Sequence, residues 1–341
     1  MTGLERVRAV FAGGKPDRTP VIPIIHAGLA GMFGVPLGRF FTDPECMADV
    51  IVRGFRTFGY DGVQLSLGVT AEPQALGALV EQPADGAPIL REHVLADAEN
   101  LGRLKQLDPL ERGGFPAFRR ALERVVEAIG GEAFVIVNLR GPFLMAAQLR
   151  GVERLLMDTI EAPDLLEAVL EFTTDLSLRL GLSFLDSGAH AVVLGEATCS
   201  PNFIPPGTYR RFVRDRHRRL IGELRGAGWE AVGLHICGNL LPILEDVLAT
   251  GANLVDIDHQ VAPRDALELN RGRAALRGNL DPSSVFAFGT PQSISQAVAS
   301  LRTQVEGAGH WIYGSGCDIS PGTSAEDLSR VLAALGVKPR R

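Results

Sequence analysis

The stretch that decides the fold reads EAVGLHICG (230–238), LLPILEDVLAT (240–250) and NLVDIDH (253–259). The first and third segments are short apolar runs that end in polar residues, which is the pattern of buried strands. The middle segment has the apolar spacing of an amphipathic helix. A strand, a helix and a second strand in this order form a βαβ unit with parallel strands. The stretch therefore predicts a parallel sheet covered by helices.

The same pattern recurs on both sides of this stretch. Six more strand-like runs are PVIPIIHAG (20–28), YDGVQLSLG (60–68), AFVIVNLRG (133–141), HAVVLGEA (190–197), AALRGNLD (274–281) and HWIYGSGCD (310–318). Amphipathic helical stretches at 117–129, 162–182 and 206–227 lie between them. Eight such units in roughly 300 residues predict an α/β fold of the (β/α)₈ TIM-barrel type. An open doubly wound sheet usually carries GxGxxG after its first strand, and this sequence has none.

Two additions to the barrel are predicted. The residues before the first strand form an N-terminal helical extension. The segment LGALVEQPADGAPILREHVL (76–95) reads as two strands around the turn Ala84-Asp85-Gly86, so we expect a β-hairpin insertion after the second strand. The sequence has no short-period repeat, low-complexity tract or linker, and we therefore expect one domain over residues 1–341.

Composition limits the kinds of partner. Hydrophobic residues make up 46% and charged residues 22% of the chain, as in ordinary globular proteins. A net charge of −6 does not give the basic surface that nucleic-acid binding requires. No apolar run approaches the roughly 20 residues of a membrane helix. The N-terminal MTGLERVRAVFAGGKPDR lacks the apolar region of a signal peptide, so we expect a cytoplasmic protein acting on small molecules.

Barrel enzymes place their chemistry at the carboxyl ends of the strands. Those ends are polar here, and the residues expected to contact substrate are Glu72, Asn138, Glu196, Asp258 and Asn279. Glu72 is included only because it follows the second strand, where capping of a loop is an equal alternative.

The motif His235-Ile236-Cys237 is the sharpest feature of this rim. Residues i and i+2 of a strand point to the same face, so the imidazole and the thiol project together. Alone, such a motif is more often two half-buried side chains without a metal. Cys317 ends the last predicted strand, which barrel closure brings toward the same mouth. One His and two Cys suit Zn²⁺, and three protein ligands leave a position open for substrate.

A fourth ligand is left open among Asp256, Asp258 and Glu196. The two aspartates lie on one strand face, where either could instead orient His235 or bind a polar group of the substrate. The other cysteines, Cys46 and Cys199, have no partner at ligand spacing, and we expect buried apolar positions for them. Neither a GxSxG elbow nor a P-loop is present.

Ordered motifs in the second half of the chain resemble a known family. They are HICG (235–238), LVDIDHQV (254–261), RGNLDP (277–282) and GSGCDISPGTSAEDL (314–328). They resemble the uroporphyrinogen decarboxylase superfamily, and within it the zinc-dependent methylcobamide:coenzyme M (corrinoid-protein) methyltransferases. The resemblance implies a TIM barrel with a catalytic zinc on His235, Cys237 and Cys317. It also implies methyl transfer from a methylated corrinoid, carried by a partner protein, to a thiol or tetrahydrofolate.

Other functions remain as alternatives. One is a zinc-dependent hydrolase or lyase in which Asp256 or Asp258 acts as general base. Another is a non-catalytic module that binds a corrinoid or tetrapyrrole. The founding decarboxylases of the superfamily carry an arginine-rich N-terminal segment, whereas the matching VIPIIHAGLAG (21–31) has no arginine, which argues against porphyrinogen decarboxylation. The methyl donor, the acceptor, the corrinoid protein and the oligomeric state are left open.

Overall fold

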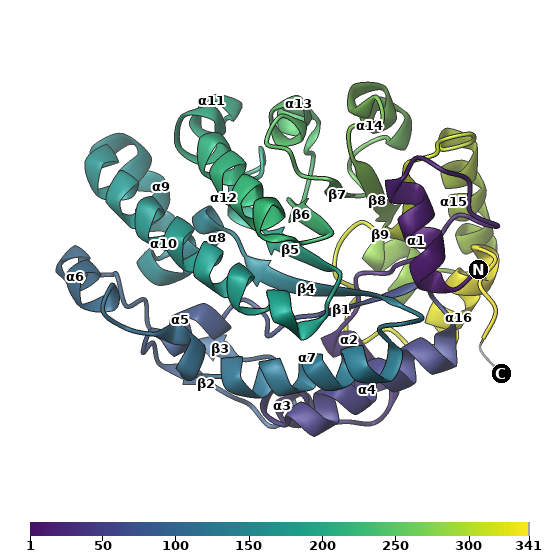
Figure 1. The fold of residues 1–341 in the computed structure, drawn as a ribbon, viewed down its shortest axis with the longest axis horizontal. Helices are drawn as coiled ribbons and strands as arrows, with labels where there is room; N and C mark the ends of the chain where they lie inside the picture. Colours follow the sequence, from purple (N-terminus) through teal and green to yellow (C-terminus); the bar gives the residue numbers. More distant parts are fainter. Residues whose placement is uncertain (340–341) are drawn as a thin grey trace.

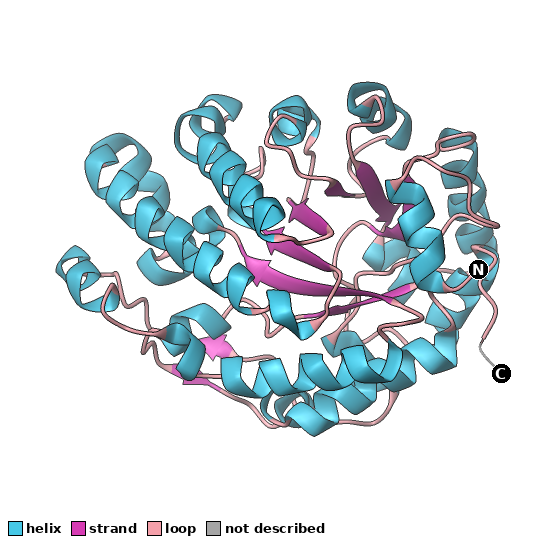
Figure 2. Ribbon diagram, viewed as in Figure 1, coloured by secondary structure: helices cyan, strands magenta, loops and turns pink. Residues whose placement is uncertain are grey.

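The computed structural model describes residues 1–339, which form a curled parallel sheet with helices around its outside (Figures 1 and 2). The sheet has seven strands in the order β1-β4-β5-β6-β7-β8-β9. Their bounds are β1 (Gly62–Leu65), β4 (Phe134–Arg140), β5 (Ala191–Gly195), β6 (Ala231–His235), β7 (Leu254–Ile257), β8 (Ala275–Leu280) and β9 (Trp311–Ser315). All neighbouring pairs are parallel, as the βαβ pattern predicts.

Helices connect the strands and cover the convex side of the sheet. In chain order they are α1 (Gly3–Phe11), α2 (Ala27–Met32), α3 (Leu37–Thr42), α4 (Pro44–Phe58), α5 (Ala71–Ala75), α6 (Leu101–Leu104), α7 (Phe115–Ile129), α8 (Pro142–Arg150), α9 (Val152–Glu161), α10 (Pro163–Ser183), α11 (Pro206–Thr208), α12 (Arg214–Ala227), α13 (Leu244–Leu248), α14 (Pro263–Asn270), α15 (Pro291–Gln304) and α16 (Ala325–Ala334). Within the described residues, no helix is both long and apolar enough to cross a membrane.

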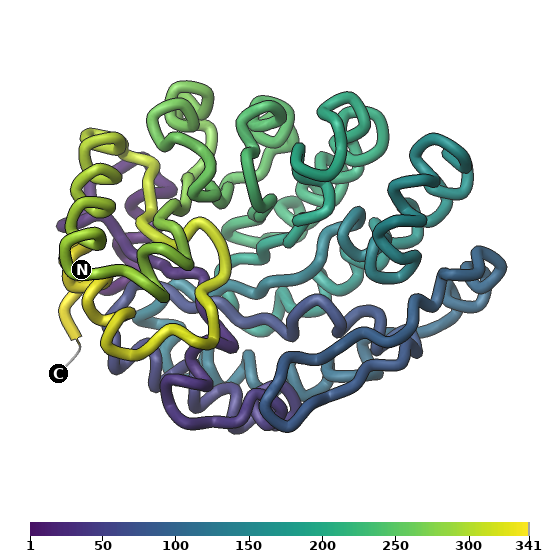
Figure 3. Tube along the Cα trace, turned by 180° about the vertical axis from the view of Figure 1, so that it is seen from behind, coloured from purple at the N-terminus to yellow at the C-terminus, as the bar shows by residue number. Residues whose placement is uncertain are grey.

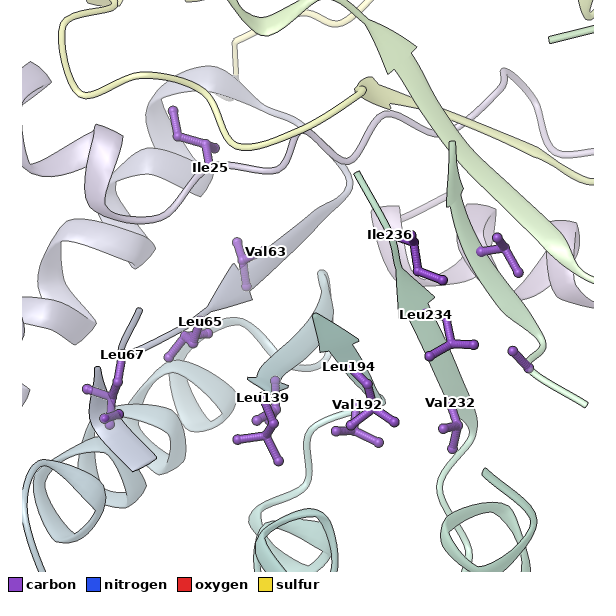
Figure 4. Close-up of a cluster of buried hydrophobic side chains, with 14 of the residues drawn as sticks. Ile25, Val63, Leu65, Leu67, Leu139, Val192, Leu194, Val232, Leu234 and Ile236 are labelled. Atoms are coloured by element: carbon purple, nitrogen blue, oxygen red, sulfur yellow. The ribbon is translucent and has the colours of Figure 1, made fainter. Parts of the chain in front are cut away.

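Alternation along the strands divides the apolar residues into two layers. Side chains such as Val232, Leu234 and Ile236 face outward and pack under the helices, as Figure 4 shows together with their neighbours on other strands. Inward-facing Phe134, Ile136 and Ala231 form a second, smaller cluster. Helix α1 packs Leu4, Val7 and Val10 into that cluster, so the predicted N-terminal extension contributes to the core at the amino ends of the strands.

The carboxyl ends of the strands are different, because their inward positions are polar. In β6 and its continuation, Ala231 and Gly233 face inward, followed by His235 and then Cys237. Asp256 in β7 pairs in register with His235, and Arg277 in β8 pairs in register with Asp256. An apolar floor thus supports a polar layer at the mouth of the curled sheet.

The predicted eight-stranded barrel is corrected at its first strand. Segment 20–28 forms only an isolated parallel bridge between Val21 and Tyr313. The segment still lies between the two edge strands, because Ile22 N donates to Tyr313 O and Asp61 N, just before β1, donates to Val21 O. Proline has no N–H to donate to a ladder, so Pro20 and Pro23 prevent a regular strand here.

The segment after β1 forms an arm at the periphery, drawn in blue in Figure 3. Within it, β2 (Val80–Glu81) pairs antiparallel with β3 (Ile89–Leu90), with the turn residues 84–86 between them. Gly38 N donates to the carbonyl of Ala84, which holds the turn against α3.

Candidate metal centre

His235, Cys237 and Cys317 converge at the carboxyl ends of β6 and β9. Their ligand atoms lie within 4.8 Å of one another, and no other group of three or more His, Cys, Asp or Glu in residues 1–339 meets this condition. The His235 Nε2 atom lies 3.2 Å from Cys237 Sγ and 3.6 Å from Cys317 Sγ, and the two sulfurs are 3.5 Å apart. All three side chains are partly exposed, so the cluster is reachable from the mouth.

These separations fit the ligands of one zinc ion. In a tetrahedral site, Zn–S bonds of about 2.3 Å and Zn–N bonds of about 2.0–2.1 Å place two sulfurs about 3.8 Å apart and a sulfur and a nitrogen about 3.6 Å apart. The three measured separations agree with those values to within about 0.4 Å. A metal on three side chains retains an open coordination position, which is typical of catalytic sites.

Asp256 and Arg277 fix the orientation of His235 from behind. The Nδ1 atom of His235 donates to Asp256 Oδ2 at 3.0 Å, so Nε2 is the nitrogen that faces the two sulfurs. Arg277, fully buried, donates to both Asp256 oxygens at 2.7 and 2.6 Å and to Gln64 Oε1 at 2.9 Å. Burial alone raises the pKa of Asp256, but the Arg277 charge and the His235 hydrogen bond outweigh it and hold that pKa at about 2.

Asp256 therefore lies where a carboxylate can orient His235, and its arrangement does not favour the alternative role of fourth ligand. Both of its oxygens already accept hydrogen bonds.

The pKa values of the three side chains in the cluster are shifted in different directions. Burial lowers the pKa of His235, but hydrogen bonds with Asp256 and Cys317 outweigh burial and raise it to about 10. The hydrogen bond between the sulfurs lowers the pKa of Cys317, with a further lowering contribution from His235. The same bond, together with burial, raises the pKa of Cys237. These directions favour a protonated His235 and a thiolate at Cys317 rather than at Cys237.

Glu196, predicted to bind substrate or to be a fourth ligand, lies outside the ligand cluster. Its carboxylate is fully buried and accepts hydrogen bonds from Phe143 N at 3.0 Å and Leu144 N at 2.7 Å. His217 Nε2, equally buried, donates to Glu196 Oε1 at 2.8 Å. These contacts join β5 to α8 and α12, so Glu196 is a structural carboxylate.

Glu72 and Asn138 lie in a second polar group, beside β1 and β4. Arg140 N donates to Glu72 Oε1 at 3.3 Å, and Arg140 Nη2 donates to Ser66 Oγ at 2.6 Å. Ser66 in turn lies 3.4 Å from Asn138 Oδ1. Burial raises the pKa of Glu72, with the Arg140 charge opposing it. Both predicted residues therefore contact this buried network rather than the metal ligands.

Asp258 and Asn279 hold the loop after β7. Asn279 Nδ2 donates to the carbonyls of Asp258 and Val261 at 3.2 and 2.7 Å, which commits this amide nitrogen to the backbone. Asp258 Oδ1 accepts from Gln260 N at 2.9 Å and lies 3.0 Å from His259 Nδ1. Asp258 is outside the ligand cluster, so neither it nor Glu196 supplies a fourth ligand in this arrangement.

Sequence reasoning missed three ionisable residues of these networks, Arg140, His217 and Arg277, and the neutral Gln64 and Ser66 that contact the two arginines. A lone arginine at the end of an apolar strand run, as in VNLR (137–140) and AALR (274–277), indicates a buried guanidinium with a polar partner. The two arginines could therefore have been predicted as parts of buried networks. His217 offered no signal, because its partner Glu196 comes from a strand packed against the helix. Cys46 and Cys199 are buried outside the cluster, as predicted.

Comparison with known proteins places the chain in a family. The sequence matches uroporphyrinogen decarboxylase (URO-D) over residues 2–336, and the chain belongs to that family.

Relatives in this family include two kinds of enzyme. The methylcobamide:CoM methyltransferase MtaA of Methanosarcina barkeri is 26% identical over 338 residues, 96% of each chain. A uroporphyrinogen decarboxylase of Nocardia farcinica is 25% identical over 344 residues, covering 95% of this chain and 93% of its own. A solved methyltransferase structure from Methanosarcina mazei superposes with a TM-score of 0.89 over 98% of both chains, at 24% identity. The several methyltransferase relatives support assignment of this chain as a methyltransferase enzyme.

Proposed function

We propose that this enzyme transfers a methyl group from a methylated corrinoid, carried by a separate protein, to a thiol acceptor at a zinc ion held by His235, Cys237 and Cys317. The observation that carries the proposal is the convergence of one imidazole and two thiols at zinc-like separations. The names of the relatives, methylcobamide:CoM and methylated-thiol:CoM methyltransferases, support both the corrinoid donor and the thiol acceptor.

The residues of the chain prepare the site before any substrate arrives. Arg277 holds Asp256, and Asp256 holds the Nδ1–H of His235, so Nε2 is presented to the metal with its lone pair free once its proton is lost. Bound to these ligands, a zinc ion would supply the positive charge that keeps an acceptor thiol deprotonated near neutral pH. The apolar floor beneath the polar layer excludes water from the amino end of the sheet.

Two alternatives are less well supported. A zinc hydrolase needs a carboxylate free to act as a general base, whereas Asp256 is bound on both oxygens. The other candidate base, Asp258, contacts Gln260 N and His259 Nδ1 of its own loop through Oδ1. Porphyrinogen decarboxylation needs cations for several carboxylates, and the segment 21–31 contains neither arginine nor lysine. Tetrahydrofolate remains the alternative acceptor, and the experiment below includes it.

The test combines metal analysis with a methyl-transfer assay. Wild-type enzyme, Cys317→Ser and the matched control Cys46→Ser, in which the thiol lies in α4 outside the cluster, are compared for zinc content by mass spectrometry. Each is then mixed with methylcobalamin and either a thiol or tetrahydrofolate, and the corrinoid spectrum is followed. We expect about one zinc per chain and thiol-dependent demethylation for wild type and Cys46→Ser, and loss of both in Cys317→Ser.

Full zinc and full activity in Cys317→Ser would refute the assigned ligands. Demethylation with tetrahydrofolate but with no thiol would overturn the acceptor. Zinc binding with no demethylation, even after addition of corrinoid proteins purified from the source organism, would overturn the methyltransferase reaction itself.

A further inference from the structure

A cavity of about 540 Å³ lies at the amino ends of the strands, beside β9. It is bounded by the segment after α1, by the end of α15 with the loop that follows it, and by the first residues of β9 (Figure 1). Trp311 begins β9 and lines the cavity, whereas the metal ligand Cys317 follows the carboxyl end of the same strand. The cavity and the metal centre therefore lie at opposite ends of the sheet. The volume is within the range of about 300–1,000 Å³ that small-molecule sites occupy.

Two glycine turns leave the entrance of this cavity open. Gly13, at φ +67°, and Gly307, at φ +77°, both adopt the left-handed conformation, which lets the chain reverse sharply. A β-carbon added at Gly307 would meet no atom within 4 Å. One added at Gly309 would lie 3.7 Å from Gly13 O, so the two loops face each other. The space between them is thus free of side chains from these glycines.

Buried apolar side chains form the inner wall of the cavity. Val10, Val305 and Trp311 all line it, although each is at most 5% exposed. The indole N–H of Trp311 donates to Gly278 O at 3.2 Å, so the ring has no polar group left for a ligand. An apolar group placed against this wall would be removed from water, which favours binding in proportion to the area covered.

Two cations of the lining have no acidic partner. Arg18 also lines the cavity, but it donates to both oxygens of the buried Asp61, at 2.6 and 3.0 Å. The Lys15 side chain makes no hydrogen bond or ion pair with any described residue. Arg302 donates to the carbonyl of Ala334 at 2.9 Å and forms no ion pair with the described part of the chain. Both cations can therefore bind an anion without breaking an existing ion pair.

A tyrosine hydroxyl lies beside one of these cations. Burial raises the pKa of Tyr313, while the Arg302 charge and the Thr19 side chain oppose that rise. The hydroxyl is thus protonated at neutral pH and can donate to an anion that Arg302 binds. Among the lining residues Glu306 is the one carboxylate, set against Lys15 and Arg302, so the groups without an ion-pair partner carry a net positive charge.

We propose that this cavity is a binding site for a small organic anion with a flat apolar body. The apolar body lies against the aromatic and aliphatic wall, where Trp311 and Tyr313 favour a ring. Its carboxylate or phosphate group is bound by Lys15 and Arg302, with the Tyr313 hydroxyl as a further donor. The site uses neither the metal nor the methyl acceptor, so the inference goes beyond the proposed function.

The experiment compares three naphthalene probes that differ in one substituent. Purified wild-type enzyme is titrated by calorimetry with 1-naphthoate, 1-naphthyl phosphate and the neutral 1-naphthalenemethanol. Charge-assisted contacts predict that at least one anionic probe binds about 10-fold or more tightly than the neutral probe. The carboxylate and phosphate arms identify which anion the site prefers. Equal affinity of all three probes, or binding of none, would overturn the proposal.

Fluorine NMR locates the bound probe. The chain has two tryptophans, Trp229 and Trp311, and of these only Trp311 lines the cavity. In enzyme labelled with 5-fluorotryptophan, the preferred probe should shift the Trp311 resonance and leave the Trp229 resonance in place. The variant Trp229→Phe assigns the two signals. A bound probe that leaves the Trp311 resonance unchanged would lie elsewhere and would refute the assigned site.

Two charge variants and a matched control test the anion contacts. Lys15→Met and Arg302→Met should each weaken binding of the preferred anionic probe by about 3- to 10-fold and leave the neutral probe unaffected. Lys105→Met, which replaces a lysine after α6 outside the cavity, should bind as wild type does. Wild-type affinity for the anionic probe in both cavity variants would show that the inference is wrong. Lys15 is exposed, so Lys15→Met decides the question should Arg302→Met not fold.

Discussion

Replacing Asp256 with asparagine tests how the metal centre is supported. The substitution keeps the shape of the side chain but removes the charge that accepts one hydrogen bond from His235 and two from Arg277. An amide at this position can also present its NH₂ group to His235, which favours the wrong tautomer of the imidazole.

Two effects of known size should follow. Loss of the carboxylate behind a metal-binding histidine lowers metal affinity by about 10- to 100-fold. Arg277 is fully buried and would lose its counterion, which costs about 3–5 kcal/mol of folding stability. Because the two effects arise from different contacts of one side chain, a second substitution can separate them.

The assay uses the single variant and the double variant Asp256→Asn, Arg277→Met. Zinc affinity is measured by competition with a chromophoric chelator, and stability is measured by urea unfolding of the metal-free proteins. The double variant no longer contains a buried unpaired charge, so it should recover most of the lost stability. Its zinc affinity should stay reduced, because His235 still lacks its carboxylate. Wild-type zinc affinity in Asp256→Asn would refute the orienting role, whatever its stability.

Three further predictions concern neighbouring groups. Because the pKa of His235 is raised to about 10 and that of Cys237 is also raised, zinc binding near pH 7 should displace about two protons. The affinity for zinc should therefore rise with pH between about 6 and 8. Calorimetry in buffers of different ionisation enthalpy measures the number of protons released on zinc binding. Release of close to zero protons would contradict the raised pKa values of His235 and Cys237. His217→Ala leaves the buried Glu196 carboxylate without one of its three hydrogen-bond donors, and should lower the free energy of unfolding by about 1–3 kcal/mol at unchanged zinc stoichiometry. Asp258→Asn should keep about one zinc per chain, measured by mass spectrometry, and loss of zinc would make Asp258 a ligand.

The strands were predictable because burial on both faces leaves a simple sequence pattern. Seven of the eight apolar runs became strands of the parallel sheet. The exception, 20–28, is equally apolar, but Pro20 and Pro23 supply no N–H to a ladder. The two prolines could have been used to predict that segment 20–28, which lies between the two edge strands, is irregular.

The metal ligands were predictable for a similarly local reason. His235 and Cys237 share a strand face by spacing alone, and Cys317 follows from the closure of the fold. The other polar residues depend on packing between elements distant in sequence. Glu196 faces a histidine on α12, and Arg277 reaches across to Gln64 on β1, so their partners could not be read from any local pattern.

X-ray absorption at the zinc edge, on enzyme with and without an acceptor thiol, tests the central claim most directly. The account predicts two sulfur ligands at about 2.3 Å and one histidine nitrogen in the resting enzyme, with a third sulfur at about the same distance after the thiol is added. A coordination shell without sulfur, or one that the thiol leaves unchanged at saturating concentration, would contradict it.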